Sequence, residues 1–344
     1  MDVRKISTDV KYNNSDISTD IAPLITSVSF SDNMTGTADD VTINIADKER
    51  KWMGSWKPKK GASLEVALLI SAGWGSNSAT KRKLGYFEID EISGDGPPNK
   101  ASIKAISVPE SSSFRGEKKS RSWENTTFKK VVQDIAKKNG LGTYFQSSEY
   151  PDYDRLDQEY ESDGAFLYRL CNEAGFALKI ANKKVCVIDE AHLERKSTVQ
   201  TINRTDQLVK RYSYKDSSSG TYKACTVAYT VKKKVKNKTV SQTLKYTFSP
   251  KKPPNTGRVL FVNEEVTSLA AAKRLAKKKL RDANKEATTI SITFAGIINL
   301  YAGQTVQIKG FGSLDGKYII TSLNGNTGSG SETSIDFRKC LEGY

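Results

Sequence analysis

The stretch that decides the fold runs from residue 161 to residue 170 and reads ESDGAFLYRL. Ser162 or Asp163 stands where a helix needs a side chain to accept its first free amide hydrogens. Gly175 supplies the left-handed residue that commonly ends a helix. Between these signals the apolar residues recur at helical spacing and form one stripe: Phe166, Leu167, Leu170 and Cys171. We therefore expect a short helix that buries this stripe.

The residues that follow predict a hairpin against which this helix packs. Two strand-like runs, 176–180 and 185–188, are joined by a short turn at 181–184. Phe166 and Leu170 lie four residues apart behind the capped start and face this hairpin. We expect both to be core anchors rather than contact residues.

An earlier helix completes a compact α+β domain at residues 109–194. It begins at Thr126 or Thr127, and its apolar stripe consists of Phe128, Val131, Val132 and Ile135. We interpret residues 111–121 as a polar linker into this helix. Residues 149–161, which are acidic and aromatic, are expected to form a loop.

Residues 1–108 show the period of two that is typical of half-buried antiparallel strands. Val41, Ile43 and Ile45 alternate with polar residues, and turn clusters recur along the segment. This pattern suits a small sandwich or barrel.

Strand patterns return in residues 195–344. A long hairpin over 224–248 is expected to carry a strongly basic tip at 232–238. The helix at 268–284 is basic and amphipathic, but its apolar face is rich in alanine and lacks Trp or Phe, which favours packing on a sheet over lying on a membrane. The order is therefore a β-rich domain, an α+β domain and a second β-rich domain. The two β-rich ends could be duplicated modules, although they share no convincing residue-level identity.

The composition limits the classes of partner. The 344 residues carry 54 Lys and Arg against 39 Asp and Glu, a net charge of +15. Such a charge favours nucleic acid, an anionic envelope polymer or an acidic protein surface, and does not choose among them. The apolar runs fall far short of the roughly 20 residues that span a bilayer, and no apolar signal core follows Met1. We expect no membrane span and folding in a reducing cytoplasm, or export without a signal peptide.

The residue types that support catalysis are scarce. His192 is the single histidine and is expected on a polar surface bend. The cysteines contain no CxxC pair, so we interpret them as small core residues rather than a zinc or redox site: Cys171, Cys186, Cys225 and Cys340. The sequence therefore predicts no catalytic, cofactor-binding or metal-binding residues, no cofactor and no enzymatic activity.

Two groups of motifs carry a family resemblance. The first consists of ESDGAFLYRL, then Glu173-Ala174-Gly175-Phe176 and the strand at 183–188. The second is a C-terminal series: AAKRLAKKKL at 271–280, the run at 289–294, AGQTV at 302–306, GFG at 310–312 and LDGKYIITS at 314–322. In this order they are similar to the late control D proteins of phages, the baseplate hub family of contractile tails. The length, the low cysteine content and the lysine-rich composition are most similar to those of hubs from Gram-positive phages and from phage-tail-like bacteriocins.

This resemblance implies a structural hub that is not an enzyme. It implies an α+β, β-rich chain with two tube-like antiparallel β-barrels, at residues 1–108 and 195–344, flanking the small α+β domain. Such hubs form homotrimers that join the six-fold tail tube to the three-fold central spike. The implied partners are the tube protein, a separate spike protein, the baseplate wedge proteins and, as a further candidate, the tape-measure protein. The implied location is the tail baseplate of a phage or bacteriocin particle, made in the bacterial cytoplasm and released by lysis.

Two other classes of function stay open at this point. A cell-wall-binding or wall-degrading tail protein would use the positive charge on wall polymers, with Asp152, Asp154 or Glu159 acting on glycan. A nucleic-acid-binding protein would use the tip at 232–238 and the helix lysines. The basic residues lack interleaved stacking aromatics, so we expect no specific nucleic-acid recognition. We expect the tip to be mobile until an acidic neighbour orders it.

Overall fold

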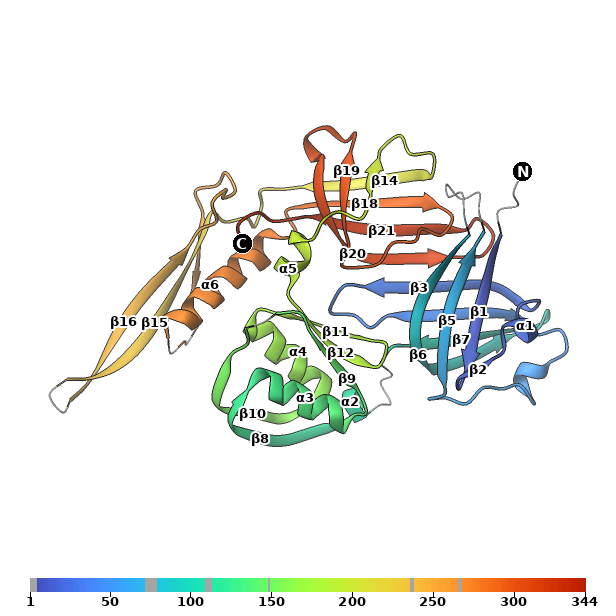
Figure 1. The fold of residues 1–344 in the computed structure, drawn as a ribbon, viewed down its shortest axis with the longest axis horizontal. Coiled ribbons are helices and arrows are strands. Elements are labelled where there is room, and N and C mark those ends of the chain that lie inside the picture. Colours follow the sequence, from blue (N-terminus) through green and yellow to red (C-terminus); the bar gives the residue numbers. More distant parts are fainter. Residues whose placement is uncertain are drawn as a thin grey trace.

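The structure is a computed structural model that describes residues 5–71, 79–108, 113–147, 149–235, 238–264, 266 and 268–344. It is β-rich with few helices, as Figure 1 shows, which confirms the predicted fold class. Three hydrophobic cores lie within the described residues. No helix in these residues is long and apolar enough to cross a membrane.

The N-terminal strands lie at the right of Figure 1 and follow the order β3-β4-β7-β6-β5-β1-β2. In β4, Val41, Ile43 and Ile45 are buried while the residues between them are partly exposed, as the alternation predicts. The elements are β1 (Ile6–Tyr12), β2 (Ser15–Asp16), α1 (Ser18–Ile21), β3 (Ile25–Asn33), β4 (Asp40–Ala46), η1 (Lys51–Met53), β5 (Ser63–Ile70), β6 (Thr80–Asp95) and β7 (Lys100–Ile106).

The C-terminal strands follow the order β14-β18-β21-β20, with β19 on β20 and β13 on β19. β20 pairs with β21 along one edge, and its other edge pairs first with β19, at Gly316–Ile319, and then with β3, at Ser322–Asn326. A bulge between Ile320 and Ser322 lies where the neighbour changes. The elements are β13 (Thr201–Asn203), β14 (Val209–Asp216), β18 (Thr288–Ala295), β19 (Thr305–Lys309), η2 (Gly312–Leu314), β20 (Gly316–Asn326) and β21 (Glu332–Lys339).

These two sets of strands form one continuous 13-stranded sheet, because β20 pairs with β3. We call this pairing the seam. One hydrophobic core runs across it and includes Ile43 and Phe87 from the first set and Ile292 and Tyr318 from the second. The two β-rich ends are therefore joined by backbone hydrogen bonds and by shared apolar packing.

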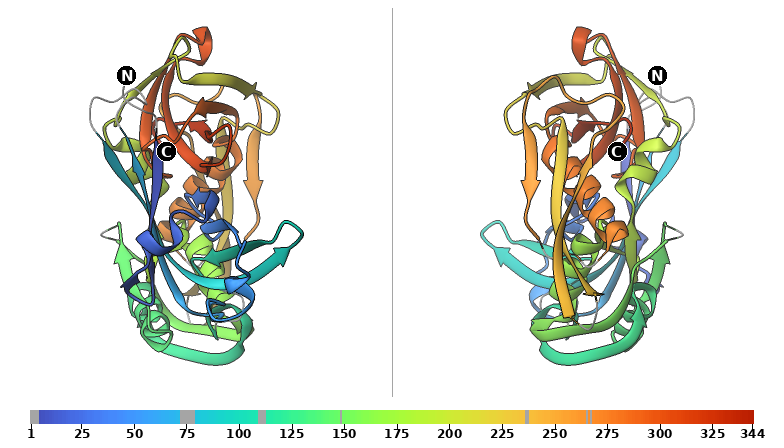
Figure 2. Two further views of the ribbon diagram at one scale, coloured as in Figure 1. Left: turned by 90° about the vertical axis from the view of Figure 1, so that its right-hand side faces the viewer. Right: turned by 90° about the vertical axis from the view of Figure 1, so that its left-hand side faces the viewer.

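The middle unit lies below this sheet in Figures 1 and 2 and has its own core. Phe166 and Leu170 are both 0% exposed, which confirms them as core anchors. Thr127 caps the first long helix and Ser162 caps the second, each by accepting an amide hydrogen. The elements are α2 (Ser113–Gly116), β8 (Lys118–Thr127), α3 (Phe128–Lys138), β9 (Gly142–Phe145), β10 (Asp152–Ser162), α4 (Asp163–Ala174), β11 (Ala177–Ala181), β12 (Lys184–Ile188) and α5 (Glu190–Arg195).

Two segments of this unit differ from the prediction. The described part of the expected linker holds α2 and the start of β8, and most of the expected loop is β10; β8 and β10 pair antiparallel with each other. Most side chains of β8 are exposed, so the strand lacks the apolar alternation that reveals a half-buried strand. Cross-strand pairs such as Leu156 with Trp123 and Arg155 with Glu124 stabilise it instead.

The segment between β14 and β18 forms a separate insert unit, which projects to the left in Figure 1. It consists of β15 (Ala224–Val235), β16 (Lys238–Phe248), β17 (Val259–Val262) and α6 (Leu269–Asn284). Ser268 caps α6, and the helix buries Ala272, Ala276 and Leu280 against this small sheet. The predicted hairpin and the sheet-packed helix are confirmed. Residues 236–237 of the basic tip lie outside the described residues, so the mobility of the tip stays a prediction.

Candidate functional site

One end of the large sheet is an open edge formed by β14. Among the described residues β14 pairs only with β18. The amide of Ser217 donates to the carbonyl of Ala287 in that ladder. Because successive amides of an antiparallel strand point to opposite sides, the amides of Tyr212 and Tyr214 face the open edge. Their side chains are 39% and 61% exposed, so this edge presents backbone donors together with aromatic surface.

The other end of the sheet, formed by β1 and the short strand β2, is partly capped. β2 pairs with β1 only at Lys11 and Tyr12. The next outward amide along β1, that of Val10, donates to Ser18 Oγ at 2.9 Å, and the carbonyl of Val10 accepts from the amide of Ile17 at 3.0 Å. The same alternation leaves the outward amides of Ile6 and Thr8 without a strand partner among the described residues.

The seam between these ends depends on a close approach. A Cβ on Gly325 would lie 2.4 Å from ring atoms of Phe30, which sits across the seam. Real Cβ atoms do not reach that distance, so glycine is required here by space. Beside it, the amide of Val28 donates to Thr327 Oγ1 at 2.8 Å and the amide of Thr327 donates to the carbonyl of Val28 at 2.9 Å.

A buried lysine ties the middle unit to the first strand set beside this seam. Lys179 Nζ, on β11, lies 2.8 Å from Asp32 Oδ1 and 3.0 Å from Asp39 Oδ2, and it donates to the carbonyl of Asn33 at 2.6 Å. Burial raises the pKa of the Asp39 carboxyl to about 6, although Lys179 opposes that rise. Burial alone would lower the pKa of Lys179, but the two aspartates raise it above its ordinary value. The lysine therefore stays protonated.

The motif residue Asp163 has a different role from the cap suggested for it. Its side chain is 0% exposed and binds Lys119 Nζ at 3.0 Å, Asn139 Nδ2 at 2.8 Å and Gln158 Nε2 at 3.1 Å, as well as Arg121. Burial raises its pKa, but the hydrogen bonds from these partners outweigh that effect and hold it below the ordinary range. Asp163 thus connects both helices and both strands of the β8–β10 ribbon.

A second buried carboxylate joins the insert unit to the body. Glu194, on α5, contacts Arg281 of α6 and Arg338 of β21, and it accepts the amide of Leu341 at 3.0 Å. Burial alone would raise the pKa of Glu194, but Arg338 and Arg281 lower it below the usual value. No sequence motif marks this cluster, because its members lie far apart along the chain.

The residues considered for chemistry do not converge. Asp152, Asp154 and Glu159 all lie exposed on β10. His192 is exposed as predicted, but it sits in the short helix α5 and not on a bend, because Asp189 caps that helix by accepting its amide hydrogen. Within the described part of the chain, no group of three His, Cys, Asp or Glu residues could hold a metal ion.

The four cysteines are free thiols. Cys171 and Cys225 are buried in cores, while Cys186 and Cys340 are partly buried. Burial raises the pKa of each of the four thiols above its ordinary value. A raised pKa lowers the thiolate fraction, so these cysteines are poor nucleophiles.

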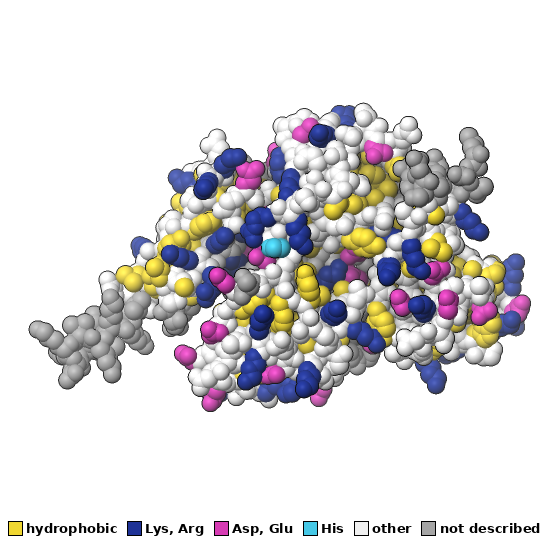
Figure 3. Space-filling model, viewed as in Figure 1, with side chains coloured by type: hydrophobic (Ala, Val, Ile, Leu, Met, Phe, Trp, Pro, Cys, Tyr) yellow, Lys and Arg dark blue, Asp and Glu magenta, His cyan; other side chains and the backbone are white. Residues whose placement is uncertain are grey.

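On the face shown in Figure 3, the positive charge is distributed and not gathered into a single stripe. Figure 3 shows Lys and Arg side chains scattered over the visible face with Asp and Glu among them. Many are paired, for example Lys81 with Asp9 and Arg169 with Glu161. This arrangement is typical of a solvated surface with local protein contacts and not of a continuous phosphate-binding track.

Comparison with known proteins identifies the fold and the family. The family model described as "Phage tail baseplate hub (GPD)" matches residues 89–328. A protein of Escherichia phage 186, described as "Probable baseplate hub protein", is 27% identical over 338 residues, covering 87% of this chain and 83% of that protein. The 43 kDa tail protein of prophage MuSo2 from Shewanella oneidensis has a similar structure, with a TM-score of 0.71 and 14% identity over 97% of this chain and 98% of that one. A tail protein from Neisseria meningitidis MC58 gives a TM-score of 0.69 and 14% identity, over 97% and 96% of the two chains.

Proposed function

The chain belongs to the phage tail baseplate hub (GPD) family, and on that premise we propose that three copies close into a ring that adapts a six-fold tail tube to a three-fold spike. The family is one of structural tail proteins, so the chain is a component of the tail baseplate. The trimer and its particular neighbours are the proposal.

The observation that carries the proposal is the continuous sheet with two unlike ends. Each chain holds two strand sets, residues 1–108 and 195–344, which the seam locks side by side. Three such chains supply six strand sets around an axis. We propose that each set is one tube-like barrel and that the middle unit at 109–194 lies outside the ring.

Closing the ring requires contacts of a single heterologous kind. The second strand set of one chain must meet the first strand set of the next, and such head-to-tail contacts close only when the rotation fits. The open edge at β14 and the free part of β1 are the surfaces that remain for this contact. Their pairing would cover exposed strand edges, which are otherwise an aggregation hazard.

The proposed partners follow from the position of such a ring. They are the tube protein on one face, a separate spike protein on the other, the wedge proteins around the outside and, as a further candidate, the tape-measure protein. We propose no enzymatic role, since Asp152, Asp154 and Glu159 lie apart from any buried partner that would set an acid against a base. A turbidity assay on purified cell walls tests this point: no clearing is expected, and clearing lost on a single carboxylate substitution would refute it.

Native mass spectrometry of the chain co-expressed with its tube and spike proteins tests the trimer. The proposal expects three hub chains in each complex. Complexes that contain two or six hub chains would contradict it. The isolated chain alone is a weaker test, because the tube or the spike can be needed to close the ring.

A further inference from the structure

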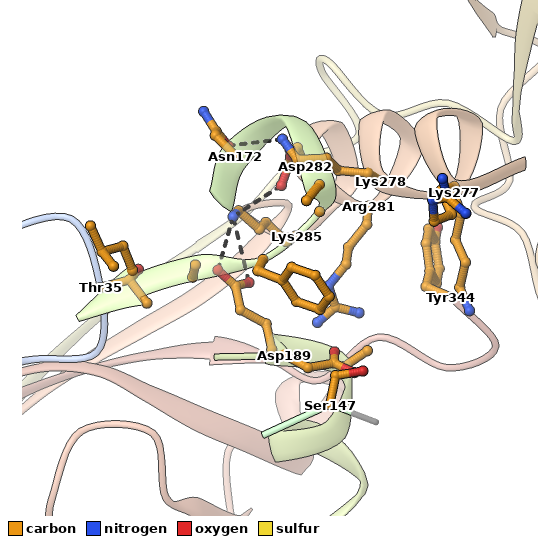
Figure 4. Close-up of a pocket in the computed structure, with 18 of the residues that line it drawn as sticks. Thr35, Ser147, Asn172, Asp189, Lys277, Lys278, Arg281, Asp282, Lys285 and Tyr344 are labelled. Carbon is orange, nitrogen blue, oxygen red and sulfur yellow. Dashed lines mark hydrogen bonds and ion pairs between the residues drawn. The ribbon is translucent and has the colours of Figure 1, made fainter. Parts of the chain in front are cut away.

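A cavity of about 380 Å³ lies where the insert unit meets the middle unit (Figure 4). Its walls come mainly from α6, from the C-terminal end of α4, from α5 and from Ser147 and Glu149. Apolar side chains, including Phe176 and Leu178, line part of it. No local sequence pattern marks this site, because its lining residues come from segments that lie far apart along the chain.

One wall of the cavity is a closed network of charges. Lys278 Nζ lies 2.8 Å from Asn172 Oδ1 and 3.1 Å from Asp282 Oδ2, and Lys285 Nζ lies 3.1 Å from Asp282 Oδ1 and 3.4 Å from Glu190 Oε1. The dashed lines in Figure 4 follow these contacts. These groups satisfy one another and hold α6 against the body.

Three exposed cations of the cavity take no part in this network. Among the described residues, the side chains of Arg195, Arg274 and Lys277 line the cavity and have no ion pair or hydrogen bond with the protein. Arg281, deeper in the wall, is only 9% exposed and is already paired with Glu194, so it is not free to bind a ligand. The three exposed cations give the cavity positive charge that no protein carboxylate neutralises, which suits an anionic ligand.

We propose that this cavity binds an extended acidic segment of a neighbouring protein subunit. Arg274 and Lys277 lie three residues apart on α6, so their side-chain origins are about 5–6 Å apart on one face of the helix. Alternate residues of an extended chain lie about 7 Å apart on one face. Carboxylates at two alternate positions of such a segment can therefore meet these two cations.

The walls favour a peptide over a nucleic acid. Glu149, Asp189, Glu190 and Asp282 also line the cavity. A continuous row of phosphates would be repelled by these carboxylates, whereas a peptide can place backbone amides opposite them. The apolar wall suits the aliphatic parts of a peptide. The inference uses the proposed function only in that a baseplate neighbour would supply the segment.

Fluorescence anisotropy on the full-length chain tests the proposal. The probe is a labelled ten-residue peptide that alternates Glu with Ala, at low ionic strength. The groove variant is Arg274→Gln/Lys277→Gln, and the matched control is Lys57→Gln/Lys60→Gln, which removes two exposed charges from the first strand set. We expect the groove variant to bind about tenfold or more weakly and the control to bind within about twofold of the parent chain.

Competition with a ten-residue thymidine oligonucleotide separates the alternatives. We expect the oligonucleotide to displace the peptide poorly. Both double variants should weaken the binding of the oligonucleotide equally, as expected for non-specific attraction to a basic protein. Equal loss of peptide binding in the groove and control variants would overturn the proposal. So would an oligonucleotide that binds more tightly than the peptide and depends on the groove cations. Equal melting temperatures of both variants exclude misfolding as the cause of weaker binding. Because the monomer can be assayed for peptide binding, a failure of this proposal can be told apart from a failure of the proposed trimer.

Discussion

The two ends of the large sheet differ in how far their outward backbone groups are covered. At the β1 end, a short strand and the hydroxyl of Ser18 cover the outward backbone near Tyr12 and Val10, while the outward amides of Ile6 and Thr8 stay without a strand partner among the described residues. At the β14 end, the whole strand is left open, and Tyr212 and Tyr214 stand exposed beside it. An open strand edge in a stable protein is normally blunted or covered. This contrast supports the proposal that β14 pairs with a partner chain, whereas part of the β1 edge is already satisfied within the chain.

The largest expected effect comes from blocking β14. Tyr214→Pro removes an amide that faces the open edge and leaves the ladder to β18 intact, because the neighbouring residues donate to β18. We expect the variant to fold but to be absent from assembled particles, with at least about a tenfold loss of incorporation measured by quantitative mass spectrometry.

The matched control for this change is Tyr214→Thr, which removes the aromatic ring and keeps the amide. If both variants assemble equally well, backbone pairing at β14 is not the contact between copies. If both fail equally, the exposed ring matters and the backbone edge does not.

The second-largest effect is expected at the seam, where two strand edges of the same chain pair with each other. Gly325→Ala places a methyl group against Phe30 and should lower the free energy of unfolding by about 1–3 kcal/mol. Urea unfolding measures this value. Gly257→Ala is the control, since a Cβ there meets nothing within 4 Å, and it should be nearly neutral. A neutral result at Gly325 would mean that the seam relaxes freely.

The charged contact beside the seam predicts a dependence on pH. Burial raises the pKa of Asp39 to about 6 in the folded chain, above its ordinary value of 3.8. The folded state therefore binds this proton more tightly than the unfolded state, and the contribution of Asp39 to stability increases as pH falls from about 7 to about 5, by about 1 kcal/mol. Unfolding of the parent chain and of Asp39→Asn should show this difference between their pH profiles. Parallel profiles would contradict the assignment.

The smallest effect is expected at the capped end. Ser18→Ala removes the acceptor of the Val10 amide and should cost about 0.5–1 kcal/mol, whereas Ser18→Thr, which keeps a hydroxyl, should cost less. Thermal unfolding compares the two. Because this edge is short, we also expect Ser18→Ala to leave incorporation into particles largely unchanged. A strong assembly defect would mean that the capped edge is itself a contact.

The sequence predicted the elements whose signals are local. The caps and stripes of α3 and α4, the apolar face of α6 and the alternation in β4 each depend on residues within a few turns or positions, and all are confirmed. β8 and β10 were missed because a two-stranded ribbon with exposed faces needs no apolar alternation.

The contacts that join the units of the fold could not be predicted from local sequence patterns. The seam joins β3 to β20, and Lys179 meets Asp32 from a part of the chain nearly 150 residues away. Motifs do not encode such pairings, because they arise when separate elements fold against one another. Gly325 shows the same limit: its role depends on Phe30, which only the fold brings near it.

A three-dimensional reconstruction of the tail baseplate tests the central claim most directly. We expect three copies of this chain around the axis, with β14 of each copy paired to the free part of β1 in the next. It also predicts that the seam within each chain alternates with this contact around the ring. A baseplate in which β14 remains unpaired, or in which the copies are related by two-fold symmetry, would contradict it.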